Sequence, residues 1–187
     1  MLSFIKPMIA NPQHLSKDDS WATPFYIIHL VEGVLRGIDF DPASSEGANE
    51  IVLAKNYFNK DGLTAEWEPG SVYLNPPGGK IGNRSSAVVW WEALMERRER
   101  QEFTHGIFMG FSLEILQTSQ DKGFKDLLEF PMCVPSKRIR FLNATTKEEQ
   151  KSPTHSQVIS YVPGSEDNTK GFLKHFAQIG SVKPWHK

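Results

Sequence analysis

The chain of 187 residues has a hydrophobic fraction of 39% and a charged fraction of 23%, ordinary values for a soluble globular protein with one compact core. Its formal net charge of -1 excludes a general electrostatic attraction to nucleic acid, so any such contact must come from a local basic patch. No run of residues approaches the roughly 20 apolar residues of a membrane-spanning helix.

The first expected elements are an irregular arm and a helix. Residues 1–20 mix Pro, Asn, Ser and Asp, which predicts an arm without regular structure. Apolar residues then recur at helical spacing over residues 25–36. Thr23 is the expected N-cap of this helix, Pro24 takes the first helical position, and Gly37 ends it.

Strands and a second helix are expected next. A short buried strand is predicted over residues 37–41 and another over residues 71–75, each followed by a loop. Small and polar residues predict a loop over residues 43–49, and three glycines predict another over residues 78–84. A helix over residues 87–100 follows, capped by a serine.

The second half of the chain continues this alternation. A strand is predicted over residues 106–111, a helix over 114–120, and a strand or loop pair over 130–142. A further strand over 156–162 precedes a terminal helix over 170–178. Helices that alternate with strands indicate an α/β fold with a mostly parallel sheet and flanking helices.

Cysteine content and the N-terminal residues bear on the compartment. Cys133 is the single cysteine, so the chain forms no internal disulfide, as expected in a reducing cytoplasm. The first residues do not have the pattern of a secretory signal. The histidines have no ligand spacing and predict no metal site. We therefore expect a soluble cytoplasmic protein without a membrane partner.

The tetrapeptide Asn75-Pro76-Pro77-Gly78 is the most informative motif, and it follows a predicted strand. Proline has no backbone N–H, so the Asn75 side-chain oxygen and the Pro76 carbonyl form a pair of acceptors without a competing donor. Two such acceptors can hold both hydrogens of an exocyclic amino group. Taken alone, the tripeptide Asn-Pro-Pro also fits an ordinary loop after a strand.

Acidic side chains follow two other predicted elements. Asp39 and Asp41 end the first strand, and Asp61 lies in an Asp-Gly turn. Ligands bind at the carboxyl ends of the strands of an open parallel sheet, so these residues and Asn75 are expected to meet in one crevice. Carboxylates there suit ribose hydroxyls or an adenine amine.

In these motifs the sequence resembles the phage DNA N-6-adenine methyltransferases, the Dam-like phage family. The resemblance runs from about Trp21 to about Pro163 and rests on the order and spacing of short motifs. These motifs are Trp21-Ala22-Thr23-Pro24, Asp41-Pro42-Ala43-Ser44 with Asn49, Asp61-Gly62-Leu63 with Trp67, Asn75-Pro76-Pro77, and Lys137-Arg138-Ile139-Arg140-Phe141. It implies a class I S-adenosylmethionine-dependent methyltransferase fold (Rossmann-like), in a single domain over residues 21–187.

The resemblance also implies roles for individual residues in a DNA adenine methyltransferase. Asn75 and the Pro76 carbonyl, with Pro77, would hold the target amine. The matched positions would also bind the cofactor S-adenosylmethionine: Thr23, Pro24, Asp41, Pro42 and Ala43 against its methionine and ribose, and Asp61 and Leu63 beside its adenine. Asn75 itself is also expected to contact the cofactor. A phage origin would place the enzyme in the cytoplasm of a bacterial host.

The chain departs from the family pattern at Gly78. The family has an aromatic residue there, which stacks on the flipped base, and glycine cannot supply that contact. Trp90, Trp91 or Tyr73 could stack in its place, although tryptophans at such positions are more often core residues. The loop over residues 43–49 also has one glycine instead of a compact Gly-x-Gly.

A basic segment is the candidate DNA contact. Alternation in Arg138-Ile139-Arg140-Phe141 places both arginines on one face and both apolar residues on the other, as in a strand. Together with Lys137, this face could bind DNA phosphates, and an ordinary solvated face fits the pattern equally well.

Two other functions remain open at this stage. Gly78 would suit a methyltransferase-like binding module without turnover, acting on nucleic acid or protein. The same acceptor pair would also suit an amine of cytosine or of an RNA base.

Overall fold

The computed structural model describes residues 21–67, 69–120 and 126–184. The expected arm over residues 1–20 lies outside these residues. The helices are α1 (Phe25–Leu35), α2 (Glu46–Val52), α3 (Ser86–Glu99), α4 (Ile115–Thr118), α5 (Thr169–Phe176) and the 3-10 turn η1 (Leu127–Glu129). The strands are β1 (Trp21–Ala22), β2 (Phe40–Asp41), β3 (Asn56–Tyr57), β4 (Ser71–Leu74), β5 (Lys80–Ile81), β6 (Arg84–Ser85), β7 (His105–Gly110), β8 (Met132–Pro135), β9 (Leu142–Asn143), β10 (Val158–Pro163) and β11 (Gly180–Lys183).

A central sheet organises the described residues. It has seven strands in the order β11-β8-β10-β7-β4-β2-β3. β3, β2, β4 and β7 pair in parallel, and β10 is antiparallel to both β7 and β8. β8 therefore points the same way as the parallel strands, and only β10 and β11 among these seven run in the opposite direction. The expected mostly parallel α/β sheet is confirmed.

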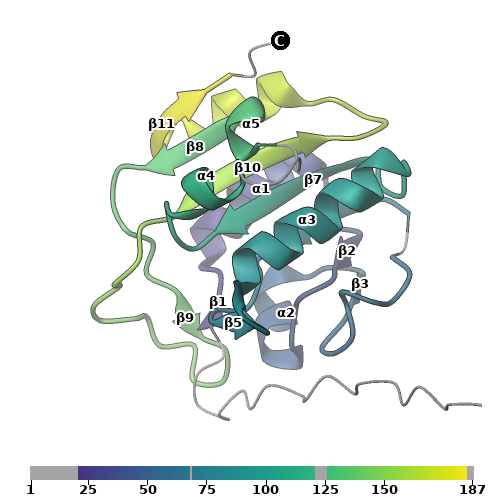
Figure 1. The fold of residues 1–187 in the computed structure, drawn as a ribbon. Coiled ribbons are helices and arrows are strands. Elements are labelled where there is room, and N and C mark those ends of the chain that lie inside the picture. Colours follow the sequence, from purple (N-terminus) through teal and green to yellow (C-terminus); the bar gives the residue numbers. More distant parts are fainter. Residues whose placement is uncertain (1–20, 68, 121–125, 185–187) are drawn as a thin grey trace, which may run out of the picture.

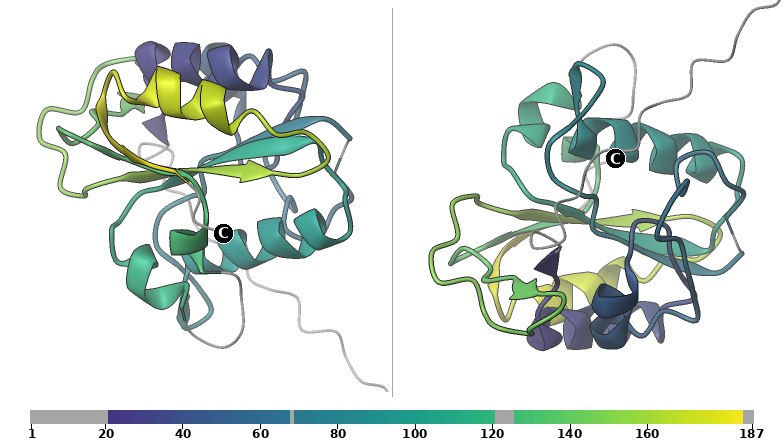
Figure 2. Two further views of the ribbon diagram at one scale, coloured as in Figure 1. Left: turned by 90° about the horizontal axis from the view of Figure 1, so that it is seen from above. Right: turned by 90° about the horizontal axis from the view of Figure 1, so that it is seen from below.

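Helices cover both faces of the sheet in three layers (Figure 1). Seen edge-on, α1 and α5 lie on one side and α3 on the other (Figure 2). The first side encloses a core that includes Ile27, Val31 and Phe172. The second encloses a core around Trp91, Leu94 and Phe108. This burial of apolar residues on both faces is typical of a parallel sheet.

The connections reverse direction between β2 and β4. From β2 the chain passes through α2 to β3 at the sheet edge, whereas from β4 it passes through α3 to β7 on the other side. Right-handed crossovers that progress in opposite directions place their helices on opposite faces, as α2 and α3 are placed. The carboxyl ends of β2 and β4 therefore form a topological switch point.

The helix expected over residues 25–36 is confirmed, but its cap differs from the prediction. Pro24 itself is the N-cap, and its carbonyl accepts hydrogen bonds from the N–H groups of Ile27 and Ile28. Thr23 makes no capping bond because its hydroxyl is buried against Tyr73. A residue that looks like a helix cap in the sequence is thus free for another role.

Three other predictions need correction. The expected loop over residues 43–49 contains the start of α2, whose N-cap Ser45 accepts from the Ala48 N–H. The expected loop over 78–84 contains the β5–β6 hairpin, and β11 was not predicted. Residues 138–141 are not a strand, although their exposure alternates as expected. Short elements that depend on tertiary contacts have weak local signals.

None of the described helices has the length and apolar character that crossing a membrane requires.

Candidate functional site

The switch point holds a small crevice between the ends of β2 and β4. Such crevices bind ligands in open α/β sheets. Its volume is about 20 Å³, a little more than one water needs, so it admits a functional group and not a whole ligand. Its polar lining is Thr23, Asp41 and Asn75, with Trp21, Ala43 and Tyr73 around them.

A chain of hydrogen bonds orients Asn75 in this crevice. The buried hydroxyls of Thr23 and Tyr73 are 2.6 Å apart, and Asn75 Nδ2 donates to Thr23 Oγ1 at 3.3 Å. Burial raises the pKa of Tyr73, so its hydroxyl stays protonated. Because the amide nitrogen is engaged by Thr23, the Asn75 Oδ1 oxygen is left as an acceptor, with no hydrogen bond from the described residues.

Asp41 is a buried carboxyl at the end of β2. Burial raises its pKa to about 7, although the Ala43 N–H and the Ser44 hydroxyl each lower it. The Ala43 N–H donates to Asp41 Oδ1 at 3.1 Å. Among the described residues no lysine or arginine forms an ion pair with Asp41, so this carboxylate is costly to the fold.

The turn that carries Asp61 and Leu63 packs on the end of β2. A Cβ added at Gly62 would lie 1.8 Å from the Pro42 carbonyl oxygen, so only glycine allows this approach. Trp67 Nε1 donates to the Gly62 carbonyl at 2.7 Å. Pro42 and the turn are thereby adjacent. The prediction that all the acidic residues meet Asn75 is wrong for Asp61 and Asp39, which do not line the crevice: Asp61 is exposed, and Asp39 binds Lys55 and Ser71 instead.

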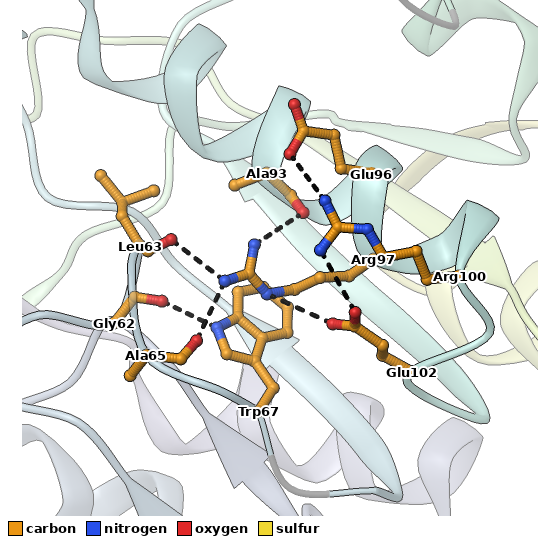
Figure 3. Close-up of polar contacts among 9 residues, drawn as sticks. All are labelled: Gly62, Leu63, Ala65, Trp67, Ala93, Glu96, Arg97, Arg100 and Glu102. Atoms are coloured by element: carbon orange, nitrogen blue, oxygen red, sulfur yellow. Dashed lines mark hydrogen bonds and ion pairs between the residues drawn. The ribbon is translucent and has the colours of Figure 1, made fainter.

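Arg97 anchors this turn from the far end of α3 (Figure 3). Its Nη2 donates to the carbonyls of Leu63 and Ala65 at 3.0 and 3.1 Å. Its guanidinium lies 4.3 Å from the Trp67 ring centroid, and its Nε is 3.8 Å from a Glu102 oxygen. Nη1 also donates to the Ala93 carbonyl at 3.2 Å. These contacts fix the shape of the turn, and we call them the Arg97 cluster.

Sequence reasoning missed Arg97 because it lies in the charged run Arg97-Arg98-Glu99-Arg100, which predicts a solvated helix end. The helical spacing of the sequence does indicate that Arg97 is buried. Arg97 follows Trp90 and Leu94 at helical spacing and shares their buried face.

The aromatic residue absent at position 78 is not replaced by the expected side chains. Trp91 and Tyr73 are fully buried and Trp90 is 5% exposed, so none of the three can stack on a base. Gly78 is exposed, and a Cβ added there would meet no atom within 4 Å. Open space for a larger side chain therefore exists at position 78.

The two prolines of the motif are more buried than Gly78. Pro76 is buried and Pro77 is half-buried directly after β4. The tetrapeptide thus begins at the half-buried Asn75 and ends in solvent at Gly78.

The basic segment lies apart from the crevice, beyond the end of β8. Lys137 and Arg138 are exposed and line a second pocket. Arg140 instead forms an exposed ion pair with Glu149, at 3.4 Å. The structure therefore divides the three expected DNA contacts between a pocket and a paired surface charge.

In comparisons with models of known protein families and with curated proteins, this chain matches none of them.

Proposed function

We propose that the protein is an S-adenosylmethionine-dependent methyltransferase that methylates the exocyclic amine of adenine in DNA. The observation that carries the proposal is the orientation of Asn75. Its amide nitrogen is bound by Thr23, and its oxygen is left as an acceptor at the switch point of the sheet.

The chemistry follows from the acceptors. The lone pair of an adenine amine is delocalised into the ring, so the amine is a poor nucleophile. Hydrogen bonds from its two hydrogens to Asn75 Oδ1 and to the Pro76 carbonyl would localise that lone pair and direct it. Positioning and electrostatic stabilisation of this kind can supply much of an enzymatic rate. The bound cofactor would supply an electrophilic methyl group on its sulfonium.

The residues around the crevice fit such a cofactor. The Asp41 carboxylate has spare acceptor capacity for hydroxyl donors, and Thr23 and Ala43 line the same crevice. The crevice itself is small, so most of the cofactor would lie across its mouth, toward the turn with Asp61 and Leu63. Lys137 and Arg138, with Arg140 farther along the surface, would contact DNA.

Transfer of a labelled methyl group tests the proposal. Purified protein is incubated with labelled S-adenosylmethionine and DNA of varied sequence, the product is digested, and the labelled nucleoside is identified. Label in N6-methyladenine is the expected result. Label in a cytosine product, or transfer to RNA alone, would correct the substrate, and no transfer together with no calorimetric binding of the cofactor would refute the proposal.

One observation favours a second candidate, a binding module without turnover. Gly78 lacks the stacking ring, and the three aromatic side chains that could replace it are buried. Cofactor binding without transfer to any nucleic acid would support this alternative.

A further inference from the structure

A second pocket lies beyond the carboxyl end of β8, where β8 and β10 separate. Its volume is about 130 Å³, many times the roughly 10–15 Å³ that one water requires. It is lined by Pro135, Ser136, Lys137, Arg138, Ser156 and Gln157. A compact polar group larger than a water therefore fits it.

The pocket is held together by a buried amide. Gln157 is 4% exposed, and its Oε1 accepts from the Ile139 N–H at 2.9 Å, across the pocket. Its Nε2 donates to the His155 carbonyl at 2.8 Å, so both ends of the amide are hydrogen-bonded. The segments that contain Ile139 and Gln157 are thus hydrogen-bonded to each other without a ligand.

The lining is positively charged. Lys137 and Arg138 contribute two cations, and no carboxylate lines the pocket. Arg138 Nη1 donates to the Pro153 carbonyl at 3.2 Å, which orients the guanidinium and leaves most of its donors unused. In the described part of the chain neither cation has an ion-pair partner. This donor set suits a tetrahedral oxyanion.

The topology relates this pocket to the crevice at Asn75. β8 and β4 point in the same direction, so both sites lie on the side of the sheet where the parallel strands have their carboxyl ends. The arrows of β7 and β8 point to that side in Figure 1. The strands β8, β10, β7 and β4 are successive neighbours. Three spacings of about 4.8 Å give a lateral separation of about 14 Å. The pocket also lies farther along the strand direction, because Leu74 and Met132 share one row of the sheet and Pro135 is three residues past that row whereas Asn75 is one residue past it. One strand of duplex DNA rises about 3.4 Å per nucleotide, so the two sites are at least about four nucleotides apart.

We propose that the pocket lined by Lys137, Arg138, Ser156 and Gln157 binds one backbone phosphate of the DNA strand, a few nucleotides from the base held at Asn75. The inference rests on the proposed function. It distinguishes Arg138, which holds a phosphate, from Arg140, whose charge is paired with Glu149. The pocket carries no sequence information and fixes the register of the strand.

The salt dependence of DNA binding tests this pocket. Affinity for a labelled duplex of mixed sequence is measured over a series of salt concentrations. Loss of one phosphate contact should make the slope of log affinity against log salt shallower by about 0.9. We expect this change in Arg138→Gln and in Lys137→Gln, and a smaller change in Arg140→Gln. Arg100→Gln is the matched control. Arg100 is the C-cap of α3, which leads to the amino end of β7, so it lies on the side of the sheet away from the pocket.

A second readout reports on the pocket directly. Inorganic phosphate should shift the backbone amide resonances of Ile139, Ser156 and Gln157 in the wild type and not in Arg138→Gln, whose other resonances verify its fold. Equal shifts in both proteins, or none in the wild type, would overturn the proposal. Equal salt slopes for Arg138→Gln and Arg100→Gln would overturn it too, as would equal effects of Arg138→Gln and Arg140→Gln.

Methyl transfer measured on the same samples separates this inference from the proposed function. A shallower slope in Arg138→Gln without transfer by the wild type would refute the methyltransferase and retain the pocket. Transfer with an unchanged slope would refute the pocket alone.

Discussion

The crevice at Asn75 and the Arg97 cluster both bury polar groups beside the same sheet, but they use them differently. Arg97 meets three carbonyls, an aromatic ring and a carboxylate. In the crevice, Asp41 has no cationic partner among the described residues, and Asn75 keeps a spare acceptor. Arg97 Nε makes no hydrogen bond with the described residues, but both Nη atoms are bonded and the charge lies near the Glu102 carboxylate, so the cluster stabilises the fold. A buried carboxylate without a cationic partner is costly instead and points to a ligand.

Replacement of Asp41 should show most clearly the free-energy cost of a buried carboxylate without a cationic partner. Its folded-state pKa of about 7 lies above the ordinary 3.8, so the folded protein retains a proton that the unfolded chain loses between about pH 4 and 7. Wild-type stability should therefore fall as pH rises through this window and level off above it. Asp41→Asn should raise the free energy of unfolding at pH 8 by up to about 4 kcal/mol.

Urea unfolding at pH 4 and pH 8 measures this effect. The gain from Asp41→Asn should nearly vanish at pH 4. A gain that does not depend on pH would mean that the carboxyl is not strained by burial.

Removal of the Asn75 amide should have the next largest effect, and on the reaction alone. Asn75→Ala removes a positioned hydrogen-bonding group, which typically costs about 100-fold or more in rate, about 3 kcal/mol. Methyl transfer should fall by that factor, while calorimetry should give a nearly unchanged cofactor affinity. A variant that retains the wild-type rate would show that Asn75 does not hold the amine.

Replacement of Arg97 should lower the free energy of unfolding, whereas replacement of Asp41 should raise it. Arg97→Met keeps the length of the side chain but leaves the carbonyls of Leu63 and Ala65 without their donor, which should cost about 2 kcal/mol in urea unfolding. Arg100→Met is the matched control. Arg100 forms only exposed ion pairs, so its loss should cost less than about 1 kcal/mol. Equal losses would place Arg97 among ordinary surface charges.

A ring added at Gly78 should give the smallest effect. The position has open space around it and no strained backbone angle, so Gly78→Tyr should be tolerated. Base–aromatic stacking is worth about 1–3 kcal/mol, and about 1 kcal/mol at this exposed position should lower the KM for DNA about fivefold. Gly78→Ala, which adds no ring, is the control. If both variants behave like the wild type, the base does not pass over this position.

The sequence predicts the elements with strong periodicity and fails where tertiary contacts decide. The helix over residues 25–36 and the strand before Asn75 are visible in local patterns. The helix α2 is hidden by Gly47 and Asn49, which disfavour helices when read alone.

For the site, sequence order brings Asp41 and Asn75 to one edge, because parallel strands end together. It could not reveal that Thr23 orients Asn75, since that bond joins residues 52 positions apart. It likewise read Arg97 as a solvated charge, because burial of a guanidinium depends on carbonyls from a distant turn. Local patterns therefore find candidate residues, and packing decides what each of them does.

The most direct test of the central claim is a crystal structure with S-adenosylhomocysteine, the product form of the cofactor. The account predicts that the ligand sulfur lies at the crevice between β2 and β4, with Asn75 Oδ1 facing it and Thr23 still bound to Asn75 Nδ2. A ligand bound elsewhere, or an Asn75 oxygen turned away from the sulfur, would contradict the account.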